Sequence, residues 1–424
     1  MKKFRKLLIG TIIFAVLYIG ILTCFLTGVI GSYKRKIDGI EKYGESFEEL
    51  QIPADAKVVG IGEATHGNCE FQVDKLRMLQ KLVETGRCHG IAFEMSPGEA
   101  AEINDAIHSE DTDLAEVMSR TDYPLYDTEQ MIDMITWMRD YNQGKSYEDS
   151  VVFYGVDMQG SGRDVEYLAS FAPKHEDIFS EKEIKLLNKM NADEDYDYSK
   201  KKDFFTDISK RLMADERQEC KYASIITEAV LQSIEAPDFE EDSSAYSKHR
   251  DSSMAENLKS FYELEKERGY SQIIITAHNG HVMKGTQDGY NVTAMGGCID
   301  EIFDGSYFCV GTAYYNACVN IHVSGTYEDN YLRQDFNFCS DDILAYQAKF
   351  FDGGSYCLNF DEVDDKNSEV YKRIHENGFM GLVGEGYSDL SGMQKEDRVK
   401  MIQGDRFDAV IYYYDVTPIR VLNY

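Results

Sequence analysis

Three ionisable side chains early in the sequence have the types that acid–base chemistry needs. Glu63 and His66 lie three residues apart in GEATHG, and Glu94 ends the apolar segment HGIAFE. A histidine with a pKa of about 6.5 accepts a proton from water at neutral pH. A carboxylate beside it fixes its tautomer and stabilises the cation that forms. These residues indicate a general acid–base site. The alternative is structural: Glu63 caps a helix, His66 is an ordinary buried imidazole, and Glu94 pairs with Lys75 or Arg77.

Further polar residues follow two other apolar segments. His278, Asn279 and His281 lie in AHNGHV after QIIITA, and Asp157 follows VVFYGV. Histidines at strand ends can polarise a carbonyl or hold a water molecule. Three histidines and two glutamates would also suit zinc or manganese, although no HExxH motif is present. We therefore predict a site without a metal and keep a metal-dependent site as the alternative.

Two basic residues are candidates for substrate binding. Lys75 lies on the first expected helix, where it could bind a carbonyl or a developing oxyanion, or simply face solvent. Arg250 precedes Asp251 in KHRDSSMAENL, at an expected helix start, where Asp251 could act only as a cap. The sequence contains neither the G-x-S-x-G motif of serine hydrolases nor a phosphate-binding P-loop.

Residues 57–94 are the unit that must position these side chains. The apolar run KVVGIG, a helical stretch over 70–85 and the run HGIAF predict a strand–helix–strand unit. Ligands of open α/β sheets bind beyond the carboxyl ends of the strands. If the two strands are parallel neighbours, the side chains that follow them meet at one edge.

The rest of the chain predicts more strands and a large helical segment. Helical periodicity covers 98–143, and buried strands are expected over 151–156, 272–277, 307–313, 355–360 and 409–414. The charged region over about 160–270 indicates a helical insertion or lid, or else a plain layer of helices on one face. The expected fold is α/β, with a mixed, largely parallel sheet flanked by helices.

Composition narrows the classes of partner. The 424 residues carry a formal net charge of -31, which argues against binding nucleic acid or wide areas of anionic lipid. The nine cysteines are scattered without a CxxC pair, so they predict no zinc ribbon. The expected partner is a small molecule.

The N-terminal segment is expected to enter a membrane. Residues 7–30 carry no charge, and at about 1.5 Å per residue this run exceeds a bilayer core of roughly 30 Å. Basic residues flank it on both sides, with the chain's amino group adding to the first cluster. We expect a cytoplasmic tip and a single-pass anchor in residues 1–36, a juxtamembrane linker over 37–56, and an extracellular catalytic domain over 57–424.

Six motifs in order resemble the erythromycin esterase family. They are GIGEATHGNCEF, IAFEMS, YGVDMQG, RDSSMAENL, AHNGHV and RFDAVIYYYDVTP, which together span residues 57–418. The resemblance implies an α/β fold with helical additions, and hydrolysis of a lactone ester by an activated water. It also implies macrolide antibiotics as substrates and antibiotic resistance as the biological role. The expected membrane anchor is a difference from the resistance enzymes of the family, which are typically soluble.

The same resemblance assigns roles to individual residues. It makes His66 the general base, with Glu63 orienting it and Glu94 in the same constellation. His278 and His281 match a family histidine motif, in which Gly280 replaces the usual alanine. Lys75 and Arg250 match basic positions near the cleft. We expect His278 and Lys75 to stabilise the oxyanion, and Asn279, Asp157, His281 and Arg250 to contact substrate. The alternatives are a metal-dependent hydrolase and a non-catalytic ligand-binding protein.

Overall fold

The computed structural model describes residues 11, 14–16, 18, 35–193, 196–287, 292–324, 332–388, 391 and 396–422. The expected membrane segment, residues 7–30, lies almost entirely outside these residues. Within them, no helix is both long enough and apolar enough to cross a membrane.

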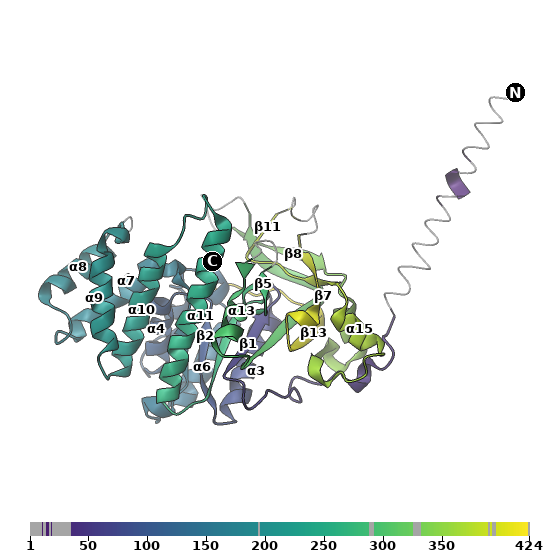
Figure 1. Cartoon of the computed structure of the whole chain (residues 1–424), viewed down its shortest axis with the longest axis horizontal. Coiled ribbons are helices and arrows are strands. Elements are labelled where there is room, and N and C mark those ends of the chain that lie inside the picture. The colour runs from purple at the N-terminus through teal and green to yellow at the C-terminus, as the bar shows by residue number, and fades with distance from the viewer. Residues whose placement is uncertain are drawn as a thin grey trace.

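The centre of the molecule is a mixed sheet in which most strands are parallel (Figure 1). Its main path runs β3-β2-β4-β1-β7-β13-β9, and β8 and β11 also pair with β7. Only β8 and β9 run antiparallel to their neighbours. The strands are β1 Val58–Glu63, β2 Cys88–Phe93, β3 Val152–Gly155, β4 Gln272–His278, β7 Tyr307–Val323, β8 Arg333–Cys339, β9 Ser355–Asn359, β11 Gly386–Tyr387 and β13 Ala409–Val416.

Two short strand pairs lie outside this sheet. They are β5 Thr286–Gln287 with β6 Val292–Thr293, and β10 Gly378–Gly381 with β12 Arg398–Met401.

Helices cover both faces of the sheet, and each face has its own apolar core. The segment between β3 and β4 is helical, and Figure 1 shows its α8 and α9 at the opposite end of the molecule from α15. The helices are α3 Cys69–Val83, α4 Pro97–Ile107, α5 Leu114–Met118, α6 Glu129–Asn142, α7 Ser161–Phe171, α8 Glu181–Asn191, α9 Lys202–Met213, α10 Gln218–Glu235, α11 Ser243–Glu267, α12 Asn279–Val282, α13 Met295–Ile302, α14 Ile343–Gln347 and α15 Glu369–His375.

The strand order corrects one expectation from the sequence. β1 and β2 are not neighbours, because β4 lies between them and pairs in parallel with both. The first two strands of the chain thus leave a space between them in the sheet. β4, about 180 residues later in the sequence, occupies that space. As a consequence, the polar residues that follow β1, β4 and β2 lie side by side at one edge.

Candidate active site

The site has two halves, each built around one buried carboxylate. Glu63, with His66 and Lys75, forms the first half. It ends β1, and its two oxygens take different partners: Oε1 lies 2.8 Å from His66 Nδ1, and Oε2 lies 2.9 Å from Lys75 Nζ. Burial alone would raise the pKa of Glu63, but the charge of Lys75 and the contact with His66 outweigh it and lower the pKa to about 2. Glu63 is therefore an ionised, buried carboxylate.

Lys75 reaches Glu63 because of its place on α3. It lies four residues after Phe71 and three before Met78, on the buried face of the helix, and only 2% of it is exposed. The sequence placed Lys75 in contact with substrate. Its ammonium group instead pairs with Glu63, so we assign it to holding that carboxylate in its charged form.

His66 is oriented by Glu63. Nδ1 faces the Glu63 carboxylate, which can only accept, so Nδ1 carries the hydrogen. Among the residues that the structure describes, the His66 ring forms its hydrogen bond through Nδ1, and none forms through Nε2. Burial lowers the pKa of His66, but the hydrogen bond and charge of Glu63, with the charges of Glu94 and Glu385, raise it above its ordinary value. The neutral ring would present a lone pair on Nε2.

Glu94 lies at the centre of the other half. Its Oε1 accepts a hydrogen bond from Arg250 Nη2 at 2.7 Å and lies 3.3 Å from His281 Nε2, and its Oε2 accepts from the His278 backbone N–H at 3.0 Å. Burial would raise the pKa of Glu94, but His281 and Arg250 hold it well below the usual range.

Helix α11 supplies the cation of this half. Asp242 caps its start by accepting from the Ala245 N–H at 2.9 Å, so Arg250 and Asp251 lie inside the helix. Arg250 also donates to both oxygens of Asp157, the shortest contact being 2.6 Å. Asp157 was expected to contact substrate, and it instead holds Arg250.

Asp251 is a site residue that the sequence treated only as a possible cap. It is fully buried and lies 2.6 Å from His281 Nδ1. Burial lowers the pKa of His281, but the charges of Glu94 and Asp251 raise it overall. The signal was the spacing of Asp251, Met254 and Leu258, which marks the buried face of α11.

His278 lies between the two halves, and its ring centre is 5.1 Å from that of His66. Its Nδ1 accepts from the Gly280 N–H at 3.3 Å, so Nε2 carries the hydrogen and donates to the Val383 carbonyl at 3.1 Å. Burial and the neighbouring His66 and His281 lower the pKa of His278 to about 3. This ring is neutral and its one N–H is already bonded, which disagrees with the expected donation to an oxyanion.

Asn279 does not join the site. Its side chain donates to the Thr312 carbonyl at 2.8 Å and accepts from the Thr312 N–H at 3.4 Å, so it fastens α12 to β7. Gly62 allows this close approach, because a Cβ there would lie 2.2 Å from the Asn279 side-chain oxygen. Asn279 was expected to bind substrate, and in this structure its side chain is instead engaged with the Thr312 backbone.

We expect Asn279→Ala to lower the free energy of unfolding by about 1–3 kcal/mol, because it leaves buried Thr312 groups without partners. Urea unfolding measures this change, with Asn188→Ala on the exposed face of α8 as the control. The KM for a cleaved substrate should not change. A rise in KM at unchanged stability would return Asn279 to the binding site.

A cavity of about 460 Å³ opens beside one end of the site. Arg250, Asp251 and His281 line it, together with four residues that the sequence did not indicate: Gln159, Phe239, Tyr246 and Ser247. Lys75, His66 and His278 are not among its lining residues. The cavity therefore lies against the end of the site that Arg250 and His281 form. Tyr126, another residue that the sequence did not indicate, donates a hydrogen bond to the Glu94 backbone carbonyl at 2.7 Å.

Known structures share this fold. A succinoglycan biosynthesis protein aligns with a TM-score of 0.70 and 17% identity, over 93% of this chain and all of that one. A Bacillus cereus protein aligns with a TM-score of 0.66 and 18% identity, over 90% and 97%. A mutant of the erythromycin esterase EreC in its open conformation aligns with a TM-score of 0.57 and 14% identity, over 86% and 91%.

Sequence comparison identifies the family. Erythromycin esterase type II of Escherichia coli is 28% identical over 163 residues, which are 38% of this chain and 37% of that protein. The alignment thus spans little more than a third of the relative. The family model described as Erythromycin esterase matches residues 83–416, most of the chain. The resemblance read from the motifs is confirmed: this chain belongs to the erythromycin esterase family.

Proposed function

We propose that this protein hydrolyses a carboxylic ester or lactone with a water molecule that His66 activates. The observation that carries the proposal is the arrangement of Lys75, Glu63 and His66. Lys75 keeps Glu63 charged, and Glu63 holds the hydrogen of His66 on Nδ1. Nε2 is left to accept a proton. This is the division of work between carboxylate and histidine in general-base catalysis.

The reaction has two steps. Nε2 of His66 takes a proton from water as the water oxygen attacks the ester carbonyl, and Glu63 stabilises the resulting imidazolium. The tetrahedral intermediate then collapses, and the proton passes from His66 to the departing alkoxide oxygen. The products are an acid and an alcohol, which remain one opened molecule if the substrate is a lactone.

Arg250 is better placed than Lys75 and His278 to stabilise the oxyanion. It lines the cavity beside His281, and its Nη1 donates a hydrogen bond to His281 Nε2 at 3.1 Å. Glu94, Asp157 and Asp251 hold them through hydrogen bonds and ion pairs of 2.6–3.3 Å. Fixed cations at the carbonyl favour the charge that develops there.

The metal-dependent alternative would need the same donor atoms. Both oxygens of Glu63 and both oxygens of Glu94 already have partners within 3.3 Å. An ion would have to displace Lys75 or Arg250 from them, so this arrangement does not fit a metal. Metal content and chelator sensitivity of the purified enzyme test that alternative.

We also propose that residues 7–30 anchor the protein with its catalytic domain outside the cell. The uncharged run and its flanking basic residues support this part. An enzyme held there would meet macrolides as they arrive, or esters of the envelope. Family membership favours macrolides, with antibiotic resistance as the biological role.

Mass spectrometry of reaction products tests the chemistry. The full-length protein is incubated with a panel of macrolides and simple esters, beside a heat-denatured sample. A macrolide that gains one water supports the whole proposal. Cleavage of simple esters without cleavage of any macrolide would support ester hydrolysis but contradict macrolides as the substrate. A folded protein that binds panel members without converting them would be the non-catalytic binding protein.

We expect kcat/KM to rise with pH through the raised pKa of His66, above its ordinary value of about 6.5, because a general base must be unprotonated. The same shift has the opposite effect on stability. A raised folded-state pKa contributes stability that is complete below the unfolded pKa and is lost as pH rises through the folded one. In Glu63→Gln the midpoint of the rise in kcat/KM should move to lower pH, because the charge that raises the pKa of His66 is removed. A profile with no ascending limb would contradict the role of His66.

A further inference from the structure

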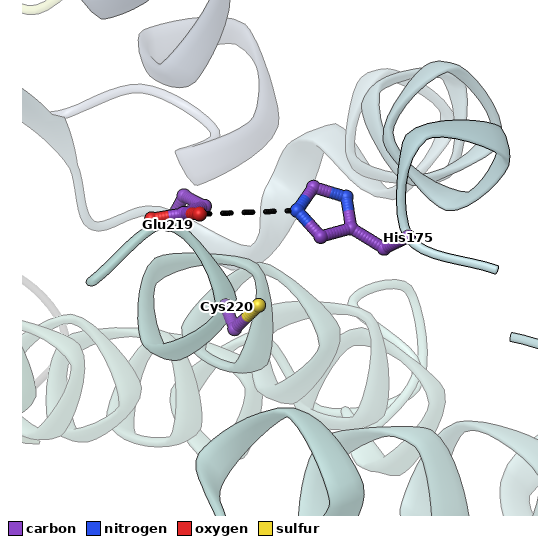
Figure 2. Close-up of side chains that lie close together, drawn as sticks. All are labelled: His175, Glu219 and Cys220. Atoms are coloured by element: carbon purple, nitrogen blue, oxygen red, sulfur yellow. Dashed lines mark ion pairs between the residues drawn. The ribbon is translucent and has the colours of Figure 1, made fainter. Parts of the chain in front are cut away.

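A second group of polar side chains lies in the helical segment, away from the candidate active site. His175 follows the short 3-10 turn at the end of α7, and Glu219 and Cys220 lie in the first turn of α10. Figure 2 shows the imidazole and the carboxylate pointing toward each other, with the Cys220 sulfur beside them. One possible ligand atom from each residue lies within 4.8 Å of the other two.

A backbone carbonyl orients the His175 ring so that Nε2 is the nitrogen free to bind a metal. Its ring stacks on Phe171 with centres 3.8 Å apart, and Nδ1 lies 3.1 Å from the Phe171 carbonyl. A carbonyl only accepts, so the hydrogen is on Nδ1 and the neutral ring has its lone pair on Nε2. Histidine ligands of metals are commonly fixed in this way by a backbone carbonyl.

Nε2 of His175 lacks a partner that would explain its position. The residue is 9% exposed, and Nε2 is 3.9 Å from Glu219 Oε1, too far for a hydrogen bond. It forms no hydrogen bond with any residue that the structure describes. Nε2 thus faces the Glu219 carboxylate and the Cys220 sulfur with no hydrogen bond, and the three ligand atoms lie within 4.8 Å of one another.

We infer that His175, Glu219 and Cys220 form a binding site for a zinc-like divalent cation. Nitrogen, sulfur and one carboxylate oxygen are ligands that suit Zn²⁺, whereas Mg²⁺ and Ca²⁺ prefer several oxygens. Zinc–ligand bonds of about 2.0–2.3 Å separate the ligands by about 3.3–3.8 Å, so the three atoms need only a small contraction. Water completes the tetrahedron on the side of Glu219, whose side chain is 55% exposed.

Binding requires the Cys220 thiol to release its proton. Burial raises the pKa of Cys220 to about 12, and the Asp215 carboxylate lies beside the thiol as an acceptor. The nearby Arg217 guanidinium is paired with Asp177 and Asp215 at 2.6 and 2.8 Å. On binding, the S–H bond breaks, the proton goes to solvent, and the thiolate bonds to the ion. The ion would then tie the end of α7 to α10, independently of the ester chemistry.

Zinc counting tests the site on the full-length, tag-free protein. After exposure to Zn²⁺ and dialysis, we expect one zinc per chain by mass spectrometry. Cys220→Ser and Glu219→Gln should each weaken binding at least about tenfold. Cys298→Ser, at a half-buried cysteine elsewhere, and His66→Ala, in the candidate active site, should keep the zinc.

Cobalt identifies the sulfur ligand directly. With Co²⁺ in place of Zn²⁺, a thiolate-to-cobalt charge-transfer band should appear in the wild type and in Cys298→Ser, and be absent in Cys220→Ser. If Cys220→Ser does not fold, Glu219→Gln still tests the site, because Glu219 is at the surface. No retained zinc would show that the three side chains lie close together without binding an ion. Loss of zinc in His66→Ala alone would place the ion in the active site, and either result overturns the inference.

Discussion

His66→Ala is expected to lower kcat/KM by at least about 100-fold, the lower end of what general bases contribute. Two decades correspond to about 2.7 kcal/mol of transition-state stabilisation. The loss should appear in kcat, because the proton is removed only as water attacks. Steady-state kinetics on any ester that the panel identifies measures the effect. His375→Ala, at an exposed histidine on α15, is the matched control.

The fold should survive this substitution. Glu63 keeps its contact with Lys75 at 2.9 Å when the imidazole is removed, so no buried charge is left alone. Unfolding by denaturant checks this point. Imidazole added to the solution should restore part of the rate, which a purely structural role would not explain. Near-normal kcat/KM in a folded His66→Ala protein would reject His66 as the base.

The positions of the candidate residues along the sheet could be predicted from sequence because strand ends are local signals. Apolar runs that stop at Glu63, Glu94, Asp157 and His278 mark the carboxyl ends of four strands, and those strands are parallel neighbours in the sheet. The order of the strands is not a local property. No residue of β1 or β2 indicates that β4 pairs with both, so the central place of His278 could not be predicted.

The direction of individual side chains depends on patterns that are easy to misjudge. Lys75 was assigned to the substrate because it is the cation that the first helix was expected to direct toward the strand-end edge, yet it lies within the apolar face formed by Phe71, Met78 and Leu82. Asp251 was considered a cap because the expected helix began too late. Asn279 could not be placed at all from sequence, because its partner Thr312 lies on a strand 33 residues later.

Lys75→Met should have the largest effect on stability. Lys75 and Glu63 are each 2% exposed, and removal of the ammonium group leaves a buried carboxylate with only His66 beside it. Loss of one partner from a buried ion pair costs about 3–5 kcal/mol, because the remaining charge is not compensated. Denaturant unfolding at neutral pH should show a loss of this size. Lys185→Met, which breaks an exposed pair with Glu181, should leave stability nearly unchanged.

Two further measurements separate lost charge compensation from lost packing. Glu63→Gln in the same chain as Lys75→Met removes the unpaired charge, so the double variant should recover most of the stability. The pH dependence gives an independent check. The pKa of Glu63 is lowered to about 2, so the carboxylate contributes stability above its unfolded pKa and loses it as pH falls through the folded value. Because both proteins share the same unfolded state, and loss of Lys75 raises the folded-state pKa of Glu63, the difference between wild type and Lys75→Met should shrink as the pH falls from that raised pKa toward about 2. Two results would mean that Lys75 acts by filling space: a stability difference between wild type and Lys75→Met that stays constant with pH, or a double variant as unstable as Lys75→Met. The charged state of Glu63 would then need another explanation.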